Sequence, residues 1–200
     1  MKKVRKVIII LISIPVVSIV LILILRYKLF PSNEEIIRSI KNTNGYVTDV
    51  EYTIINAKNN YTEEATINYT KGINTRIQFK NNIEKNYNDD GTITINYNNY
   101  QYNTNYNNDI VYSLAIVNKV MNSSDEDSVA DLKSITEERD EWGEKEYLVL
   151  KYCVNNTNRN VNNICLYINK KDKIPVVMKV YDYENRERAI IVYKSFKYIK

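Results

Sequence analysis

The side chains that could support chemistry are few and scattered. The chain has no histidine, so the commonest metal ligand and the commonest general base are both missing. Neither Cys153 nor Cys165 has a histidine partner to activate its thiol, and their spacing is not that of a Cys-x-x-Cys redox motif. The serines lack an imidazole base for the same reason. The sequence therefore predicts no nucleophilic catalysis.

Other patterns of catalysis or ligand binding are missing as well. The glycines, at positions 45, 72, 91 and 143, are isolated, so they cannot form a phosphate-binding loop. The acidic run from Asp125 to Asp127 lacks the loop pattern of a cation site. No pair of carboxylates is singled out by its context for acid–base work. We expect a protein that is not an enzyme and that uses neither a metal nor a cofactor.

The first thirty residues indicate a membrane anchor. Val7–Leu25 contains 19 residues without a charge, which as a helix nearly spans a hydrocarbon core. A cleaved signal peptide is the alternative, but no small-x-small cleavage site follows Leu25. More basic residues precede this segment than follow it, which favours a cytoplasmic N-terminus. We expect a cytoplasmic basic tail (1–6), a transmembrane helix (7–25), a short linker (26–31) and an extracytoplasmic domain (32–200).

The net charge of +4 comes from the flanks of this segment. Without the six basic residues there, 22 basic residues remain against 24 acidic ones. Nucleic-acid binding requires basic residues gathered on the folded domain. We therefore expect no nucleic-acid partner.

Alternating apolar residues predict a strand-rich domain. The apolar side chains of Tyr46, Val50, Tyr52 and Ile54 share the even positions, in the pattern of a half-buried strand. Hairpins are predicted at Thr70–Gly72 and Asp89–Gly91, each a three-residue loop with a glycine, and the second places Ile83 beside Tyr97. A two-residue turn at Asn98–Asn99 reverses the parity of the next strand.

Helices are predicted at fewer places. The first follows Pro31, with Ser32 as N-cap and Glu35 as its capping-box partner. The second runs from about Asp109 to Met121, with an apolar stripe suited to packing on a sheet. A short helical segment is predicted near 129–132.

The C-terminal half contains two predicted strands that end near the cysteines. If Cys153 lies opposite Cys165, Leu150 lies opposite Ile168 and the apolar faces coincide, which brings the thiols within reach of a disulfide. The alternative is a register shifted by two residues with both thiols reduced. Two further strands follow, at about 176–183 and 187–198. The apolar run 189–193 predicts a central strand covered on both faces, without showing which face is the core.

Aromatic residues are the candidates for an interaction surface. Tyr97, Tyr100 and Tyr102 form an exposed patch if their hairpin lies at a sheet edge, and they pack inward otherwise. Trp142, in a predicted turn, is a second candidate anchor, and capping the end of the sheet is its alternative role.

The order of elements, with the closing stretches Asn169–Val176, Lys179–Glu187 and Phe196–Tyr198, resembles the lipoprotein-carrier LolA-like superfamily, closest to the clostridial germination lipoprotein GerS and its relatives. The resemblance implies an α+β fold in which a curved antiparallel sheet, close to a half-barrel, packs on two or three helices. It also implies a non-catalytic partner of a CwlD-like cell-wall amidase that supports modification of spore-cortex peptidoglycan. The chain lacks the lipobox cysteine of a lipoprotein, and no functional residue is transferred.

Two other functions are compatible with this resemblance. A lipid or lipoprotein chaperone would need an apolar cavity, for which Ile36, Ile40, Leu114 and Val117 are the candidate lining if they are not core. An envelope-stress sensor would instead bind an anti-sigma factor. Only identification of the partner separates that function from amidase binding.

Overall fold

The computed structural model describes residues 15–22, 31–106, 109–123, 129–139, 143–153 and 158–199. Within these ranges, eleven antiparallel strands form a single sheet in the order β6-β5-β4-β3-β2-β1-β11-β10-β9-β8-β7. The strands are β1 (Gly45–Ile55), β2 (Asn60–Thr70), β3 (Thr75–Phe79), β4 (Ile83–Tyr87), β5 (Thr92–Tyr97), β6 (Tyr100–Asn105), β7 (Val129–Arg139), β8 (Gly143–Cys153), β9 (Asn163–Asn169), β10 (Ile174–Tyr181) and β11 (Glu187–Tyr198).

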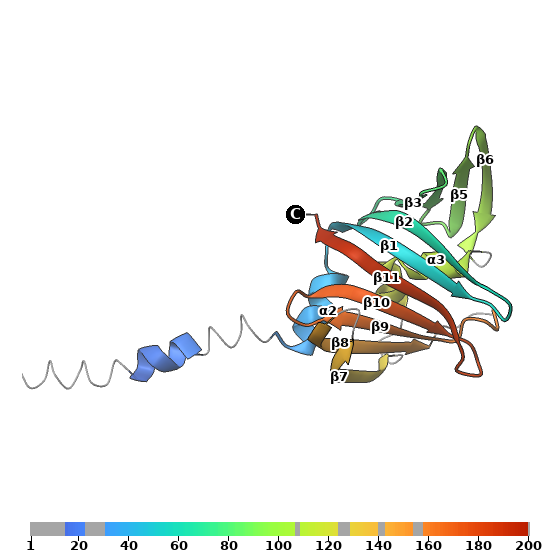
Figure 1. Cartoon of the computed structure of the whole chain (residues 1–200). Coiled ribbons are helices and arrows are strands. Elements are labelled where there is room, and N and C mark those ends of the chain that lie inside the picture. Colours follow the sequence, from blue (N-terminus) through green and yellow to red (C-terminus); the bar gives the residue numbers. More distant parts are fainter. Residues whose placement is uncertain are drawn as a thin grey trace, which may run out of the picture.

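The chain builds this sheet outward from its middle and then inward from the opposite edge. Strands β1 to β6 follow one another to one edge, and the chain then crosses to β7 at the other edge and returns to β11. The last strand therefore pairs with the first, from Tyr46 opposite Tyr198 to Ile54 opposite Ala189. The sheet curves without closing (Figure 1). The predicted α+β class with an open, curved antiparallel sheet is confirmed.

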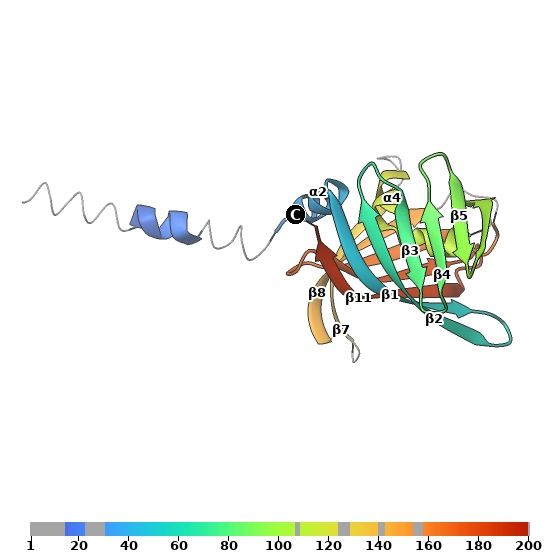
Figure 2. The same cartoon turned by 90° about the horizontal axis from the view of Figure 1, so that it is seen from above.

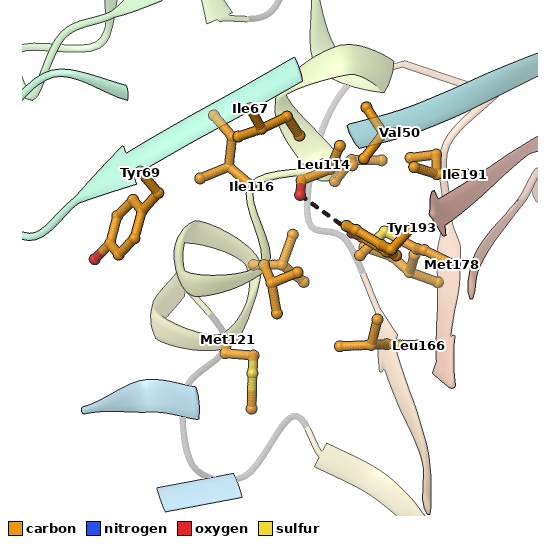
Figure 3. Close-up of a cluster of buried hydrophobic side chains, with 14 of the residues drawn as sticks. Val50, Ile67, Tyr69, Leu114, Ile116, Met121, Leu166, Met178, Ile191 and Tyr193 are labelled. Carbon is orange, nitrogen blue, oxygen red and sulfur yellow. Dashed lines mark hydrogen bonds between the residues drawn. The ribbon is translucent and has the colours of Figure 1, made fainter. Parts of the chain in front are cut away.

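Three helices cover the middle of the concave face: α2 (Asn33–Lys41), α3 (Ile110–Leu114) and α4 (Val117–Ser123). Figure 2 shows α2 and α4 behind the strands of the N-terminal half. Apolar side chains of these helices and of the sheet form one buried cluster, part of which is drawn in Figure 3. Hydrogen bonds join the two layers: the Tyr193 hydroxyl donates to the Ala115 carbonyl over 3.1 Å, and the Val117 N–H donates to the Tyr46 hydroxyl over 3.1 Å.

The first predicted helix is confirmed, and the second is divided. The Ser32 hydroxyl accepts from the Glu35 N–H at 3.2 Å, as an N-cap requires. The helix predicted from Asp109 to Met121 breaks between α3 and α4, where Ala115 and Ile116 are fully buried. At the break, both side chains pack in the core, and the Tyr193 hydroxyl donates a hydrogen bond to the Ala115 carbonyl.

The helical segment predicted at 129–132 is wrong. These residues begin β7, whose pairing with β8 runs from Val129 opposite Tyr152 to Arg139 opposite Gly143. A four-residue apolar pattern does not distinguish a helix from a strand, and here the pairing with β8 decides.

Two of the three predicted turns are confirmed. Ile83 lies opposite Tyr97, and Tyr97 lies opposite Tyr100 across the two-residue turn in which Asn98 has a φ of 49°. The β2–β3 loop is longer than predicted because Ile67 pairs with Ile77. Thr75 takes the inward position there, and Ile73 is left exposed.

Strand β11 is central, and the structure assigns its faces. Ala189, Ile191 and Tyr193 belong to the core beneath the helices. Ile190 and Val192 are half-buried on the other face, in a smaller apolar cluster around Val177, Tyr147 and Tyr167. A bulge opposite Asp49/Val50 then changes the parity, so Phe196 also packs against the main core.

The N-terminal segment is described only for residues 15–22, which are helical and carry exposed apolar side chains. Among the described residues, no helix has both the length and the apolar character needed to span a bilayer. Residues 7–14 and 23–25 of the predicted anchor lie outside the described residues.

Candidate interaction surface at the edge of the sheet

The hairpin that carries the three candidate tyrosines forms one edge of the sheet. In the part of the chain that the structure describes, β6 pairs with β5 alone. The exposed fractions of Tyr97, Tyr100 and Tyr102 are 46%, 77% and 55%. Tyr97 lies opposite Tyr100, and Ile95 lies opposite Tyr102, so the three rings share the concave face with Ile95. We call these three side chains the tyrosine edge.

The tyrosine edge lies next to the part of the concave face that the helices cover. Ile95 is only 6% exposed, whereas Tyr97, the next residue on the same face, is largely open to solvent. The tyrosines therefore lie on the concave face but are exposed there. Of the two alternatives that the sequence left open, the exposed patch is the one observed, because β6 is an edge strand and the helices cover only the middle of the sheet.

A pocket of about 360 Å³ opens beside the tyrosine edge. Its size falls in the range of sites that hold a small ligand or a protruding side chain. Its walls combine apolar side chains, phenol rings and a charged pair. The lining residues are Ile83, Lys85, Ile95, Tyr97, Tyr102, Thr104 and Asp109.

The charged pair in this pocket fastens α3 to the sheet. The Lys85 ammonium lies 2.6 Å from a carboxylate oxygen of Asp109, with 11% and 10% of the two side chains exposed. The Tyr87 hydroxyl donates to the other carboxylate oxygen, and the Lys85 ammonium lies 3.9 Å from the centre of the Tyr112 ring. Both oxygens of Asp109 and the positive charge of Lys85 are therefore satisfied inside the fold.

Burial and hydrogen bonding also keep the neighbouring phenols neutral. Burial raises the pKa of Tyr112 far above its ordinary value, and the hydrogen bond from its hydroxyl to Glu63, 2.6 Å long, raises it further. Burial, followed by the negative charge of Asp109, raises the pKa of Tyr87. These hydroxyls act as hydrogen-bond donors, so the cluster holds the structure together without offering a base.

Sequence reasoning did not identify the pair of Lys85 and Asp109. One signal was available: Lys85 occupies the inward parity between Ile83 and Tyr87, where an apolar residue is expected. Its partner is 24 residues away and precedes a helix, so the pattern alone could not name it.

The structure contradicts the predicted pairing of the cysteines. Lys151, not Cys153, lies opposite Cys165, and Cys153 lies opposite Asn163. The two cysteines are diagonal neighbours, about 7–8 Å apart, which is beyond ordinary disulfide reach. Both thiols are free, and burial raises the pKa of Cys165. The register shifted by two residues is the one observed.

The remaining candidates from the sequence are placed as follows. Trp142 lies outside the described residues, so its role as an anchor stays a prediction. The acidic run 125–127 lies outside them as well. The described residues contain no group of three or more metal-ligating side chains.

Together, these features define an α+β domain with an open antiparallel sheet, a helix-covered core and an uncovered tyrosine edge. The family model of the sporulation protein YdcC-like family matches residues 4–200. The chain therefore belongs to the sporulation protein YdcC-like family. Comparison with curated proteins gives no match.

Solved structures of similar fold share little sequence with this chain. An uncharacterised conserved protein from Thermus thermophilus has a TM-score of 0.48 at 11% identity, covering 84% of this chain and 87% of its own. A LolA superfamily protein from Nitrosomonas europaea has a TM-score of 0.42 at 8% identity, with coverage of 84% and 93%. The structure of the CwlD amidase from Clostridioides difficile in complex with the GerS lipoprotein contains a chain with a TM-score of 0.42 at 18% identity, with coverage of 84% and 96%. These are similarities of fold alone, and they include the LolA superfamily that the sequence resemblance indicated.

Proposed function

We propose that this chain is a membrane-anchored, non-catalytic sporulation protein that binds a partner protein through the tyrosine edge. The observation that carries the proposal is the exposure of Tyr97, Tyr100 and Tyr102 on an edge strand. Tyrosine is enriched at protein interfaces because its ring combines a large apolar surface with a polar hydroxyl. The edge also presents backbone N–H and C=O groups that a partner can use.

The shape of this edge suits a protein partner. The adjacent pocket can receive a single projecting side chain, while the tyrosines surround it with a broader apolar surface. A buried anchor surrounded by such contacts is the usual arrangement of an interface hot spot.

The membrane anchor is supported by the uncharged segment Val7–Leu25 and by basic residues on both of its sides. Within it, residues 15–22 are helical, and the exposed fractions of Val16, Val17 and Ile22 are 54%, 63% and 62%. A lipid environment accounts for an apolar helix that buries so little within the protein. The domain from residue 32 onward then lies on the extracytoplasmic side.

A non-catalytic role is supported by the chemistry of the side chains. The chain has no imidazole, burial raises the pKa of the Cys165 thiol, and the carboxylate of Asp109 is occupied by Lys85 and Tyr87. In the described pocket, the carboxylate of Asp109 is thus engaged in hydrogen bonds within the fold.

No observation favours a lipid chaperone over a protein-binding domain. The four residues that would line a lipid cavity are all members of the buried core. Ile36, Ile40 and Val117 are fully buried, and Leu114 is 6% exposed.

The partner class tested first is a cell-wall amidase, since membership of the sporulation family and the sequence resemblance to GerS suggest this enzyme. The full chain, solubilised from membranes of sporulating cells, is used to capture proteins for mass spectrometry. We expect an amidase with the wild-type chain and at least about a tenfold loss with Tyr100→Asp/Tyr102→Asp, because a charge in a hot spot is strongly unfavourable.

The matched control is Tyr183→Asp, which places the same charge on another exposed tyrosine, 57% open, in the β10–β11 turn. It should capture the partner as well as the wild-type chain does. Equal capture by all three chains would refute the tyrosine edge as the binding surface. Capture of an anti-sigma factor in place of an amidase would retain the surface and change the partner.

A further inference from the structure

Three segments meet at the end of the domain where the chain enters α2. The Lys71 N–H in the β2–β3 turn donates to the Asn44 carbonyl, and the Ile199 N–H donates to the Gly45 carbonyl, both over 2.9 Å. The β9–β10 turn joins them, because the Tyr198 hydroxyl donates to the Lys173 carbonyl over 2.7 Å. Figure 1 shows the C-terminus at the end of the sheet where the chain passes from α2 into β1. We call this the entry end.

The entry end exposes two isoleucines. Ile73 is 63% exposed and Ile199 is 45% exposed, although most of the domain's isoleucines lie in the core. The two residues flank the same stretch of backbone, since the turn of Ile73 and the strand end of Ile199 bond to adjacent residues, Asn44 and Gly45. Gly45 permits this approach: a Cβ there would lie 3.2 Å from the Cδ1 of Ile199 and 2.7 Å from the Tyr69 carbonyl oxygen.

Basic residues lie in the segments that carry these isoleucines and in the turn beside them. The β9–β10 turn carries Lys170, Lys171 and Lys173 against the single acid Asp172, and the neighbouring segments add Lys71 and Lys197. Lys170 and Lys173 also pair with Glu146 and Glu35, whereas Lys71, Lys171 and Lys197 are exposed. Exposed apolar side chains with exposed lysines near them match the interface of an anionic bilayer, where apolar groups enter the headgroup layer and ammonium groups meet phosphates.

The length of the linker restricts the distance between this end and the membrane. Seven residues, 26–32, separate the proposed transmembrane segment from α2, and they reach at most about 25 Å. Because Glu35 in the first turn of α2 pairs with Lys173 over 2.7 Å, the β9–β10 turn of the entry end is held close to that distance from the bilayer surface.

We infer that the entry end of the domain rests on the anionic lipid surface, with Ile73 and Ile199 in the headgroup layer and Lys71, Lys171 and Lys197 at the phosphates. This inference rests on the membrane anchor of the proposed function. It also gives the domain an orientation. Since β5 and β6 are reached by successive hairpins, their turn at Asn98–Asn99 lies at the end of its strands opposite to the β2–β3 turn of the entry end.

The test uses the full chain in liposomes whose lipids carry bromine on the acyl chains, because bromine quenches a tryptophan that enters the bilayer. Ile73→Trp is made in a chain with Trp142→Phe, which removes the other tryptophan. Tyr183→Trp in the same background is the control, since it is exposed in a turn at the far end of the domain. With phosphatidylglycerol in the liposomes, we expect at least about twofold stronger quenching of Ile73→Trp than of Tyr183→Trp.

Charge provides the second readout. Adding Lys71→Glu and Lys171→Glu, or replacing phosphatidylglycerol by phosphatidylcholine, should reduce the difference in quenching to near zero, because each lysine near an anionic surface contributes about a fivefold preference. Equal quenching of the two tryptophans, in a chain that still floats with the liposomes, would overturn the docking and leave the anchor intact. A chain that does not float with them would overturn the anchor itself.

Discussion

Lys85 in β4 and Asp109 before α3 form a charged pair against a largely apolar face of the sheet. Their side chains are only about a tenth exposed, and the carboxylate also accepts from Tyr87. Removing one member of such a pair leaves an unpaired buried charge, which is more harmful than removing both. We therefore interpret the pair as the attachment of α3 to the sheet beside the tyrosine edge.

At this residue scale, Asp109→Ala is expected to lower the free energy of unfolding by about 3 kcal/mol, because Lys85 loses its counter-charge and Tyr87 its acceptor. The double variant Lys85→Met/Asp109→Leu should recover at least half of that loss. Urea unfolding of the three chains measures both differences. If the double variant is no more stable than Asp109→Ala, the two residues do not act as a pair.

At the scale of elements, the pairing of β8 with β9 determines whether the two cysteines are close enough to form a disulfide. Cys153 faces Asn163, and both cysteines lie on the face away from the helices, together with Lys151. A cysteine placed opposite Cys153 would be at the separation that a disulfide requires, whereas Cys165 is diagonal to it.

We accordingly expect Asn163→Cys to form a disulfide between Cys153 and the new cysteine under mild oxidation, found by peptide mapping under non-reducing conditions. The wild-type chain, treated in parallel, should keep two thiols that react with an alkylating reagent. A link between Cys153 and Cys165 in the wild-type chain would show instead that β9 is shifted by two residues.

At the scale of the whole molecule, the domain closes on itself through its first and last strands. The ring of Phe196 stacks on Tyr46 with 4.6 Å between ring centres, and Tyr198 bonds to the β9–β10 turn. The first buried residue of the described domain is Pro31. The core thus depends on the C-terminal strand and on no described residue before Pro31.

Deleting residues 1–30 should therefore leave a soluble domain whose melting temperature is unchanged to within about 2 °C. Deleting residues 195–200 in addition should lower the melting temperature by at least about 5 °C, since the stacking on Tyr46 is lost. Circular dichroism melts of the two shortened chains make the comparison. An aggregated 31–200 chain would contradict the independence of the domain.

Features set by local chemistry were predicted well. Ser32 caps α2 by accepting from the Glu35 N–H one turn on, and the turns at Asp89–Gly91 and Asn98–Asn99 determine the pairing of the strands beside them. Each of these depends on residues only a few positions apart, so the sequence pattern contains the whole interaction.

Features that join distant segments were predicted poorly. A strand that slips by two residues keeps the same side chains on the same face, so the apolar pattern could not distinguish Cys165 from Asn163 as the partner of Cys153. The segment after Val129 was predicted as a helix because its pairing with β8 is not visible in a short apolar pattern. The pairing of Lys85 with Asp109 could not be predicted either, because it joins residues that are far apart in the sequence.

The sequence by itself determined the absence of imidazole chemistry, the uncharged N-terminal segment and the alternation that produces an antiparallel sheet, because composition and short-range periodicity suffice for each. The tertiary structure alone decided that β6 is an edge and that the helices cover the sheet only as far as Ile95. Exposure of the tyrosine edge depends on where separate elements pack against each other, and tyrosine occurs both inside proteins and at their interfaces. Its residue type therefore could not indicate which of the two applied.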